Sequence, residues 1–222
     1  MSDSPDAVHP LHPLPPLLRG WVHLVFFFIS LPAAVLVVAS AGTTRARFGA
    51  VVYAVGLCLL FGVSATYHRL RWSPPARRRM RRMDHATIFV MIAGSYTPLC
   101  LLVLRGTTAN VILTVAWAGA AVGVVLASTG IAERSVFGLA CYIALGWVMV
   151  AAAPQLLRRL SATEMLLIVI GGLLYTAGAI ILGTRRPDPF PRVFGYHEVW
   201  HVMVAAAALC HYVTIFSVVR AG

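Results

Sequence analysis

Long apolar stretches separated by short polar connections run along most of this chain. Seven of them come close to the 20 or so residues that an α-helix needs to cross a lipid bilayer, and they cover residues 20–41, 49–70, 84–104, 111–130, 136–154, 165–184 and 199–219. Short connections make successive helices antiparallel neighbours and leave no room for a separate soluble domain. The pattern therefore predicts an all-α fold, an integral membrane bundle of seven transmembrane helices.

The first nineteen residues lack this pattern. They hold five prolines and two aspartates, and Arg19 is their one basic residue. The apolar stretch that follows is too long for a signal peptide and shows no clear cleavage site. We therefore expect residues 1–19 to form a disordered tail and residues 20–222 to form the seven-helix domain.

Composition supports a membrane protein. The chain is 59% hydrophobic and 11% charged, with a mean hydropathy of +0.83, which is too apolar for an ordinary soluble domain. The net charge of +11 comes from arginines that flank the apolar stretches, so we expect membrane lipids and no nucleic acid as partners. Single cysteines inside apolar stretches predict neither a disulfide framework nor a thiolate metal site; they are Cys58, Cys100, Cys141 and Cys210.

The positions of the arginines predict how the bundle is inserted. Basic residues are enriched in the cytoplasmic connections of membrane proteins. With the tail inside, the inner segments hold twelve arginines and the outer segments six, and seven of the twelve lie in the connection from Arg69 to Arg82. The count predicts a cytoplasmic N-terminus and an extracytoplasmic C-terminus, and it places the arginine-rich connection against anionic lipid headgroups.

A pair of histidines near the end of the chain points to a metal site. His197 and His201 are four residues apart at the start of the last apolar stretch. On a helix they lie one turn apart on the same face, where both can bind a single ion. A stable zinc site needs three or four ligands, so another segment must supply the rest.

Three polar residues elsewhere fall on the same side of the membrane as this pair. Ser64 and His68 end the second apolar stretch, and Asp84 begins the third. In a seven-helix bundle the end of helix two and the starts of helices three and seven share one side, whichever way the protein is inserted. We therefore expect His68, His197 and His201 to bind one metal ion, with Asp84 as a fourth ligand or as the group that orients a bound water.

This donor set suits hydrolysis. Three neutral imidazoles leave a zinc ion its full charge and one open position, where the pKa of a bound water can fall to about 7. Asp84 would accept the proton of that water, and Ser64 would assist it or bind a substrate oxygen. The alternative is structural, since an aspartate at the start of a helix is a common N-terminal cap.

The segment from His197 to His201 also fits the HExxH signature of zinc proteases, in which the glutamate is the general base. That reading makes Glu198 catalytic and leaves Ser64, His68 and Asp84 without a role. We instead expect Glu198 to lie at the membrane interface near Arg185 and Arg186.

The remaining histidines of the helices carry weaker expectations. We expect His23, at the start of the first apolar stretch, to be an interfacial residue. His85 points away from Asp84 on a helix, so it can at most support the site from behind. His211 is too far along its helix from His197 to share an ion, about 21 Å, and we expect it to face the interior of the bundle.

Several motifs together resemble the hemolysin III family, the bacterial branch of the progestin and adipoQ receptor superfamily. They are Ser64-x-x-x-His68, Asp84-His85, Gly94-Ser95-Tyr96-Thr97-Pro98 and His197-Glu198-x-x-His201. The resemblance covers the chain after the tail. It implies a multi-pass protein of the bacterial cell membrane with a cytoplasmic-side zinc bound at His68, His197 and His201, and Asp84 holding the water. The serine at position 64 belongs to a pattern shared with alkaline ceramidases, which are zinc-dependent lipid amidases.

Three classes of function fit these expectations. The first is a zinc-dependent hydrolase of a membrane lipid amide or ester. The second is a sensor or regulator of membrane lipid state, in which zinc ties helices two and seven together. The third, suggested by the name of the family that the chain resembles, is a pore-forming hemolysin. The sequence leaves the substrate and the oligomeric state open.

Overall fold

A computed structural model describes residues 16–130 and 135–222, and within these ranges every regular element is helical. Seven helical segments are long and apolar enough to cross a membrane. The helices are α1 (Trp21–Ala39), α2 (Thr44–Arg69), α3 (Pro74–Pro98), α4 (Gly106–Thr129), α5 (Ser135–Trp147), α6 (Ala153–Arg159), α7 (Ala162–Thr184) and α8 (Tyr196–Ala221). The prediction of an all-α bundle of seven transmembrane helices is confirmed; the predicted tail up to residue 15 lies outside the described residues.

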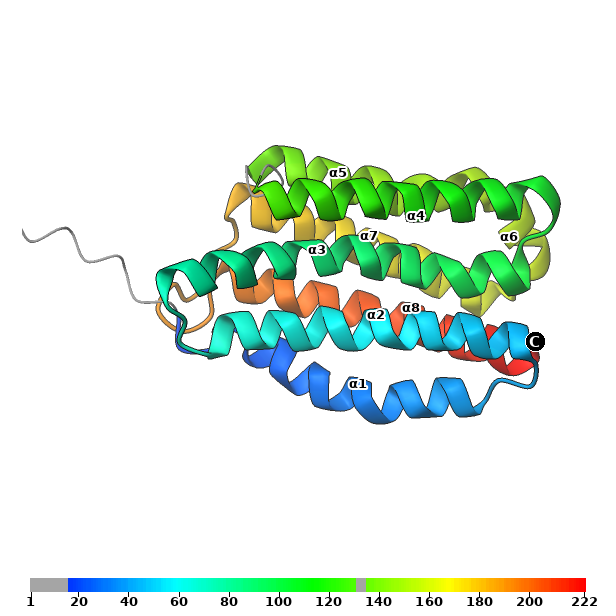
Figure 1. Ribbon diagram of the computed structural model, residues 1–222, viewed down its shortest axis with the longest axis horizontal. Helices are drawn as coiled ribbons and strands as arrows, with labels where there is room; N and C mark the ends of the chain where they lie inside the picture. Colours follow the sequence, from blue (N-terminus) through cyan, green and yellow to red (C-terminus); the bar gives the residue numbers. More distant parts are fainter. Residues whose placement is uncertain (1–15, 131–134) are drawn as a thin grey trace, which may run out of the picture.

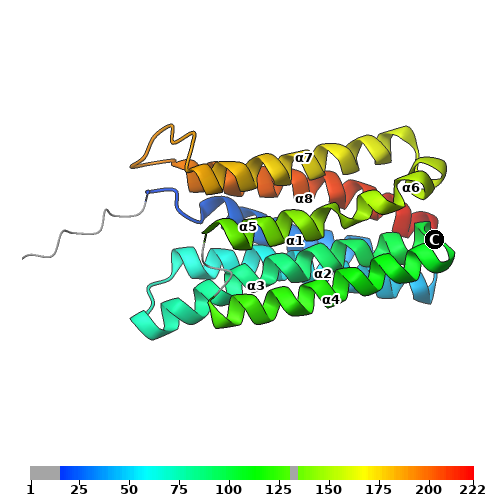
Figure 2. The same cartoon turned by 90° about the horizontal axis from the view of Figure 1, so that it is seen from above.

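The helices lie side by side and alternate in direction, so that each end of the bundle collects particular connections (Figure 1). The N-terminal end holds the start of α1, the α2–α3 connection and the α7–α8 connection, whereas the chain terminates at the opposite, C-terminal end (Figures 1 and 2). α8 packs extensively on α7 and also contacts α1, α2 and α3. The last helix therefore closes the bundle against the first three.

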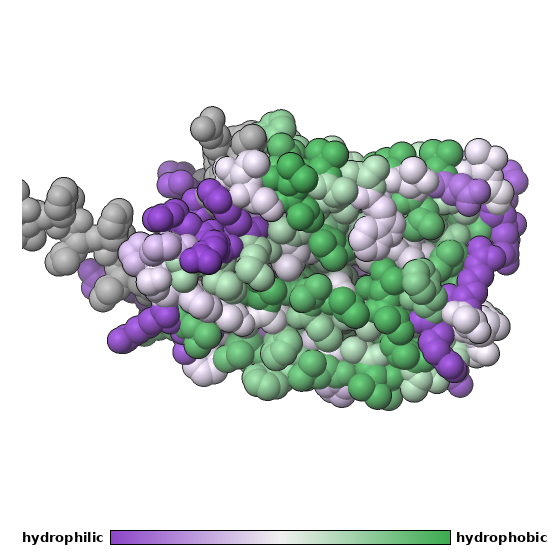
Figure 3. Space-filling model, in the orientation of Figure 1, coloured by the Kyte–Doolittle hydropathy of each residue, from purple (hydrophilic) through white to green (hydrophobic). Residues whose placement is uncertain are grey.

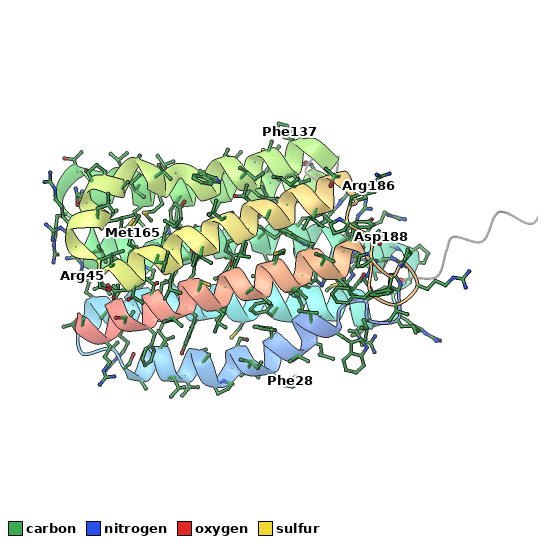
Figure 4. The ribbon with its side chains drawn as sticks, turned by 180° about the vertical axis from the view of Figure 1, so that it is seen from behind. Phe28, Arg45, Phe137, Met165, Arg186 and Asp188 are labelled. Atoms are coloured by element: carbon green, nitrogen blue, oxygen red, sulfur yellow. The ribbon has the colours of Figure 1, made fainter. Side chains whose placement is uncertain are left out.

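Apolar side chains cover the flank of the bundle, and polar ones gather at its two ends (Figure 3). Phe28 on α1 is 62% exposed and Phe137 on α5 is 52% exposed, and both project outward (Figure 4). An apolar surface of this extent is unfavourable in water but matches the interior of a bilayer. The chain is therefore a multi-pass membrane protein.

Helix α3 begins earlier than the sequence pattern predicts. It starts at Pro74, ten residues before the predicted start at 84, because Ser73 is extended and proline is well suited to the first helical turn. The arginines from 77 to 82 therefore lie on a helix that projects from the apolar belt, and the α2–α3 connection is short. At its other end α3 passes after Pro98 into one π-helical turn, Leu99–Val103.

The fifth span is interrupted. α5 ends at Trp147, and a 3₁₀ segment, Val148–Ala152, joins it to α6, so the span continues to Arg159 instead of ending at 154. Tyr96 of α3 fills the break, because its hydroxyl accepts a hydrogen bond from Met149 N–H (3.1 Å) and donates to the Leu145 carbonyl (3.0 Å). Backbone groups freed inside a membrane need such partners.

Small residues on α7 allow α8 to approach closely. A Cβ atom added to Gly178 would lie 2.7 Å from Trp200, and one added to Gly171 would lie 2.4 Å from the His211 ring. Close packing of this kind is the main attraction between helices in lipid. It fixes α8, which carries the histidine pair.

Candidate metal centre

Three histidines meet at the N-terminal end of the bundle. His68 comes from the last turn of α2, and His197 and His201 come from the first two turns of α8. One ring nitrogen from each lies within 4.8 Å of those of the other two, and His68 Nε2 lies 3.3 Å from His197 Nε2. The structure thus brings together the three histidines that the sequence groups by their side of the membrane.

The start of α8 is fixed by hydrogen bonds that its own sequence supplies. The Glu198 carboxylate accepts the backbone N–H of Gly195 (2.9 Å), and Asp188 accepts that of Tyr196 (2.8 Å). Carboxylates are favoured there, because the first N–H groups of a helix have no partner within it. These contacts set the position and direction of the turn that carries His197.

Glu198 does not lie at the membrane interface beside Arg185 and Arg186, as the sequence suggested. It is fully buried, and its other oxygen pairs with Arg19 Nε at 2.5 Å. The pair joins residues that are 179 positions apart, so no local pattern indicates it. Each Glu198 oxygen already accepts a hydrogen bond, which leaves the carboxylate poorly suited to be the general base of a protease.

Asp84 and Ser64 lie beside the histidines. The nearer Asp84 oxygen is 3.9 Å from His68 Nε2, and the buried Ser64 side chain lines the same cavity as Asp84. Because α3 begins at Pro74, Asp84 is not its N-terminal cap, and the structural alternative for this residue is wrong. The carboxylate instead stands within the same polar layer as the three imidazoles.

His23 is the residue of this region that the sequence analysis missed. It is 3% exposed, so it is not the interfacial residue that we expected. Its ring stacks on that of His201, with centroids 3.8 Å apart and planes 8° from parallel, and its edge faces Phe61. The crossing count that placed His68 beside the α8 histidines could also have placed His23 there, because the start of the first helix lies on the same side of the membrane.

Two further histidines are placed nearby or deeper. His85 Nδ1 lies 2.9 Å from the Arg81 carbonyl, one turn earlier on α3. This contact is with its own helix and not with the three histidines. His211 faces the interior, as expected, with Nε2 3.4 Å from the Ile168 carbonyl of α7.

A cavity of about 610 Å³ leads from this layer into the bundle. Its walls come mainly from α3, α5, α7 and α8, with side chains of α1 and α2 at the histidine end, and they are mainly apolar. Asp84, Ser64 and the α8 histidines line one end, and Met165 lines the other, near the C-terminal end of the bundle (Figure 4). A volume of this size can hold a ligand of drug or lipid-chain size.

One pair of the three imidazoles has the spacing of tetrahedral zinc ligands, and the ligand atoms of all three lie within 4.8 Å of one another. Two nitrogens bound to one zinc at 2.0–2.1 Å in tetrahedral positions lie about 3.3 Å apart, which equals the separation of His68 Nε2 and His197 Nε2. His201 Nδ1 is buried and has no hydrogen-bond partner among the described residues. A buried polar atom without a partner is energetically costly. Coordination of a metal ion by this group would offset the cost of burying the three rings.

Comparison with known proteins gives related chains over most of the length. The model of the family described as haemolysin-III related matches residues 12–212. The chain is 29% identical to Hemolysin-3 of Bacillus cereus over 200 residues, 88% of each chain, and 28% identical to a Hemolysin-3 homolog of Bacillus subtilis (strain 168) over 82% of this chain and 84% of the relative. It is also 28% identical to the human monocyte to macrophage differentiation factor, over 74% of this chain and 68% of the relative.

Proposed function

This chain belongs to the haemolysin-III related family, and from this premise we propose that it is a zinc-dependent hydrolase of an amide or ester bond in a membrane lipid. The observation that carries the proposal is the position of the three-histidine group. Two of its members, His197 and His201, line the polar end of an apolar cavity together with Asp84 and Ser64, and His68 lies beside them. A lipid bound there would have its acyl chain in the cavity and its polar linkage beside the histidines.

In this proposal each side chain has a separate task. His68, His197 and His201 would hold the zinc, which when bound would supply Lewis acidity and lower the pKa of water. Asp84 accepts a proton at its carboxylate, and the Ser64 hydroxyl, which lines the same cavity, orients that carboxylate or binds a substrate oxygen. The apolar walls bind the acyl chain and exclude bulk water from the reacting bond.

The proposed site faces the cytoplasm of a bacterial cell. Supporting this, the N-terminal end of the bundle carries the arginine-rich start of α3 and the Arg185–Arg186 pair, and basic residues favour the inner side of the membrane. The substrate would then come from the inner leaflet.

A regulatory role is the second candidate. The histidines come from α2 and α8 alone, so a metal there would join the second helix to the last and could act as a structural clamp. A haemolytic activity, which the name of the Bacillus cereus relative suggests, would be revealed by ion conductance of the purified protein in liposomes.

The decisive experiment compares Asp84→Asn with the wild type after purification in detergent. We expect bound zinc to remain near one ion per chain, because the three imidazoles are intact, while hydrolysis of a ceramide-like or ester lipid panel falls at least about 100-fold with loss of the proton acceptor. His68→Ala should lose both zinc and hydrolysis. Zinc in the wild type without hydrolysis of any lipid in the panel would favour the clamp over the enzyme.

A further inference from the structure

The first turn of α1 lies directly on the three-histidine group, although no residue of α1 belongs to that group. The backbone N–H groups of Leu17 and Leu18 donate to the carbonyls of Arg192 and Val193 in the α7–α8 connection, both at 3.0 Å. The residues just before α1, which the sequence assigns to a disordered tail, are thereby held against the segment that leads into α8.

Arg19 and Gly20 extend this contact to the helices that carry the histidines. Arg19 pairs with the buried Glu198, one residue from His197. Gly20 has φ +77°, and a Cβ atom there would lie 2.6 Å from His68 Cβ. Glycine is required at this point for two reasons, the left-handed backbone and the close approach to His68.

His23 completes the contact one turn into α1. Its ring covers one face of the His201 ring at 3.8 Å, and Phe61 of α2 supports it from the side at 5.1 Å. Both ring nitrogens of His23 are buried without a hydrogen-bond partner among the described residues. The contact that His23 makes with the site is therefore through the flat face of its ring.

We propose that the start of α1 positions the metal ligands, with His23 fixing the ring plane of His201 by stacking and Arg19 fixing the start of α8 through Glu198. The inference rests on the proposed function in one respect, namely that the three histidines bind zinc. Supporting groups of this kind commonly change metal affinity about 10- to 100-fold. Here the support is mainly an aromatic face instead of the usual hydrogen bond to the second ring nitrogen.

The stacking role is tested by two substitutions at one position. The measurement is zinc affinity of the detergent-purified full chain, by competition with a chromogenic chelator, for wild type, His23→Ala and His23→Phe. We expect His23→Ala to weaken zinc binding at least about 10-fold, and His23→Phe to stay within about threefold of wild type because the flat face is kept. Phe28→Ala, on the outward face of the same helix, is the control and should not differ from wild type.

The absorption spectrum of the cobalt-substituted protein gives a second readout. A change of ligand geometry alters the visible bands of Co²⁺, so the spectrum should shift in His23→Ala and stay unchanged in His23→Phe. A His23→Ala chain with a lower melting temperature but wild-type affinity and spectrum would show that His23 only stabilises the fold.

The zinc affinities of the two variants also separate stacking from metal ligation by His23. If His23→Phe loses as much zinc as His23→Ala, the ring nitrogens act as ligands and the stacking proposal is wrong. If wild type and His23→Ala bind zinc equally, the proposal fails while the zinc site stands. A wild-type protein that binds no zinc overturns both the proposed function and this inference.

The role of Arg19 is tested against a control substitution of a second arginine. Arg19→Gln is compared with Arg45→Gln, which lies at the opposite end of the bundle (Figure 4). We expect the first to lower zinc affinity several-fold and the second to leave it unchanged. Equal affinity in the two variants would remove Arg19 from the positioning role.

Discussion

The Arg19–Glu198 pair shows how much a single residue can depend on distant sequence. Glu198 is buried, with 1% of its side chain exposed, and its carboxylate is stabilised by one arginine and one backbone N–H. A buried carboxylate without its partner is strongly destabilising. The pair therefore contributes to folding as well as to the position of the adjacent His197.

We expect Glu198→Gln and Arg19→Gln each to lower the free energy of unfolding, and the double variant to be little worse than the worse single variant. Breaking a buried pair costs about 3–5 kcal/mol, and less here because 22% of the Arg19 side chain is exposed. Thermal unfolding of the four proteins in one detergent completes the double-mutant cycle. Additive losses would mean that the two side chains act independently.

Ser64 permits a second test with a single atom removed. Ser64→Ala deletes the hydroxyl that lines the cavity with the Asp84 carboxylate while leaving the three imidazoles in place. If the protein is the hydrolase proposed above, the rate should fall about 10-fold, less than in Asp84→Asn, with zinc content unchanged. A loss of zinc equal to that of His68→Ala would instead place Ser64 among the groups that hold the metal.

At the scale of elements, the packing of α7 on α8 decides where two of the three histidines lie. Gly178 meets Trp200, which is the residue before His201, and the nearest contacts of an added Cβ are a Trp200 ring atom at 2.7 Å and Met203 Cβ at 2.9 Å. An aromatic ring packed between helices cannot yield as the end of a flexible side chain can. The absence of a side chain at Gly178 therefore sets how closely α8 approaches α7.

We expect Gly178→Ala to destabilise the bundle by about 1–3 kcal/mol through overpacking and to weaken zinc binding, since α8 must shift. Gly172→Ala on the same helix is the matched control, because nothing lies within 4 Å of an added Cβ there. It should equal or exceed the wild type in stability, as alanine is the better helix former. Thermal unfolding and zinc content of both variants provide the comparison; equal effects would show that the contact with Trp200 is unimportant.

At the scale of the whole molecule, the insertion of the bundle determines which leaflet the site can reach. The apolar surface on the flank seen in Figure 3 shows no direction by itself. Only the distribution of arginine between the two ends favours one orientation, with the N-terminal end inside.

Cysteines introduced at the two ends test this orientation. Phe190→Cys lies in the exposed α7–α8 connection and Thr163→Cys in the exposed first turn of α7. In intact cells an impermeant maleimide should label Thr163→Cys and spare Phe190→Cys, which should react only after the membrane is opened. The unsubstituted chain, whose cysteines all lie within helices, is the background. The reverse labelling pattern would place the site outside.

The sequence alone determined the number of spans, the all-α class and the fact that the polar residues share one end of the bundle. Span number and helix class follow from the length and period of apolar stretches, which are local properties. The grouping of His68, Asp84, His197 and His201 then followed from counting crossings. Helix ends were less accurate, because Pro74 and the break after Trp147 depend on turn geometry and on Tyr96.

Only the tertiary structure decided which helices are neighbours and which faces meet. The stacking of His23 on His201, the pairing of Arg19 with Glu198 and the cavity all join segments far apart in the chain. Counting crossings restricts a side chain to one layer but does not fix its direction around a helix axis. That direction is set by close packing between helices, such as Gly178 against Trp200, where the shapes of both surfaces act together.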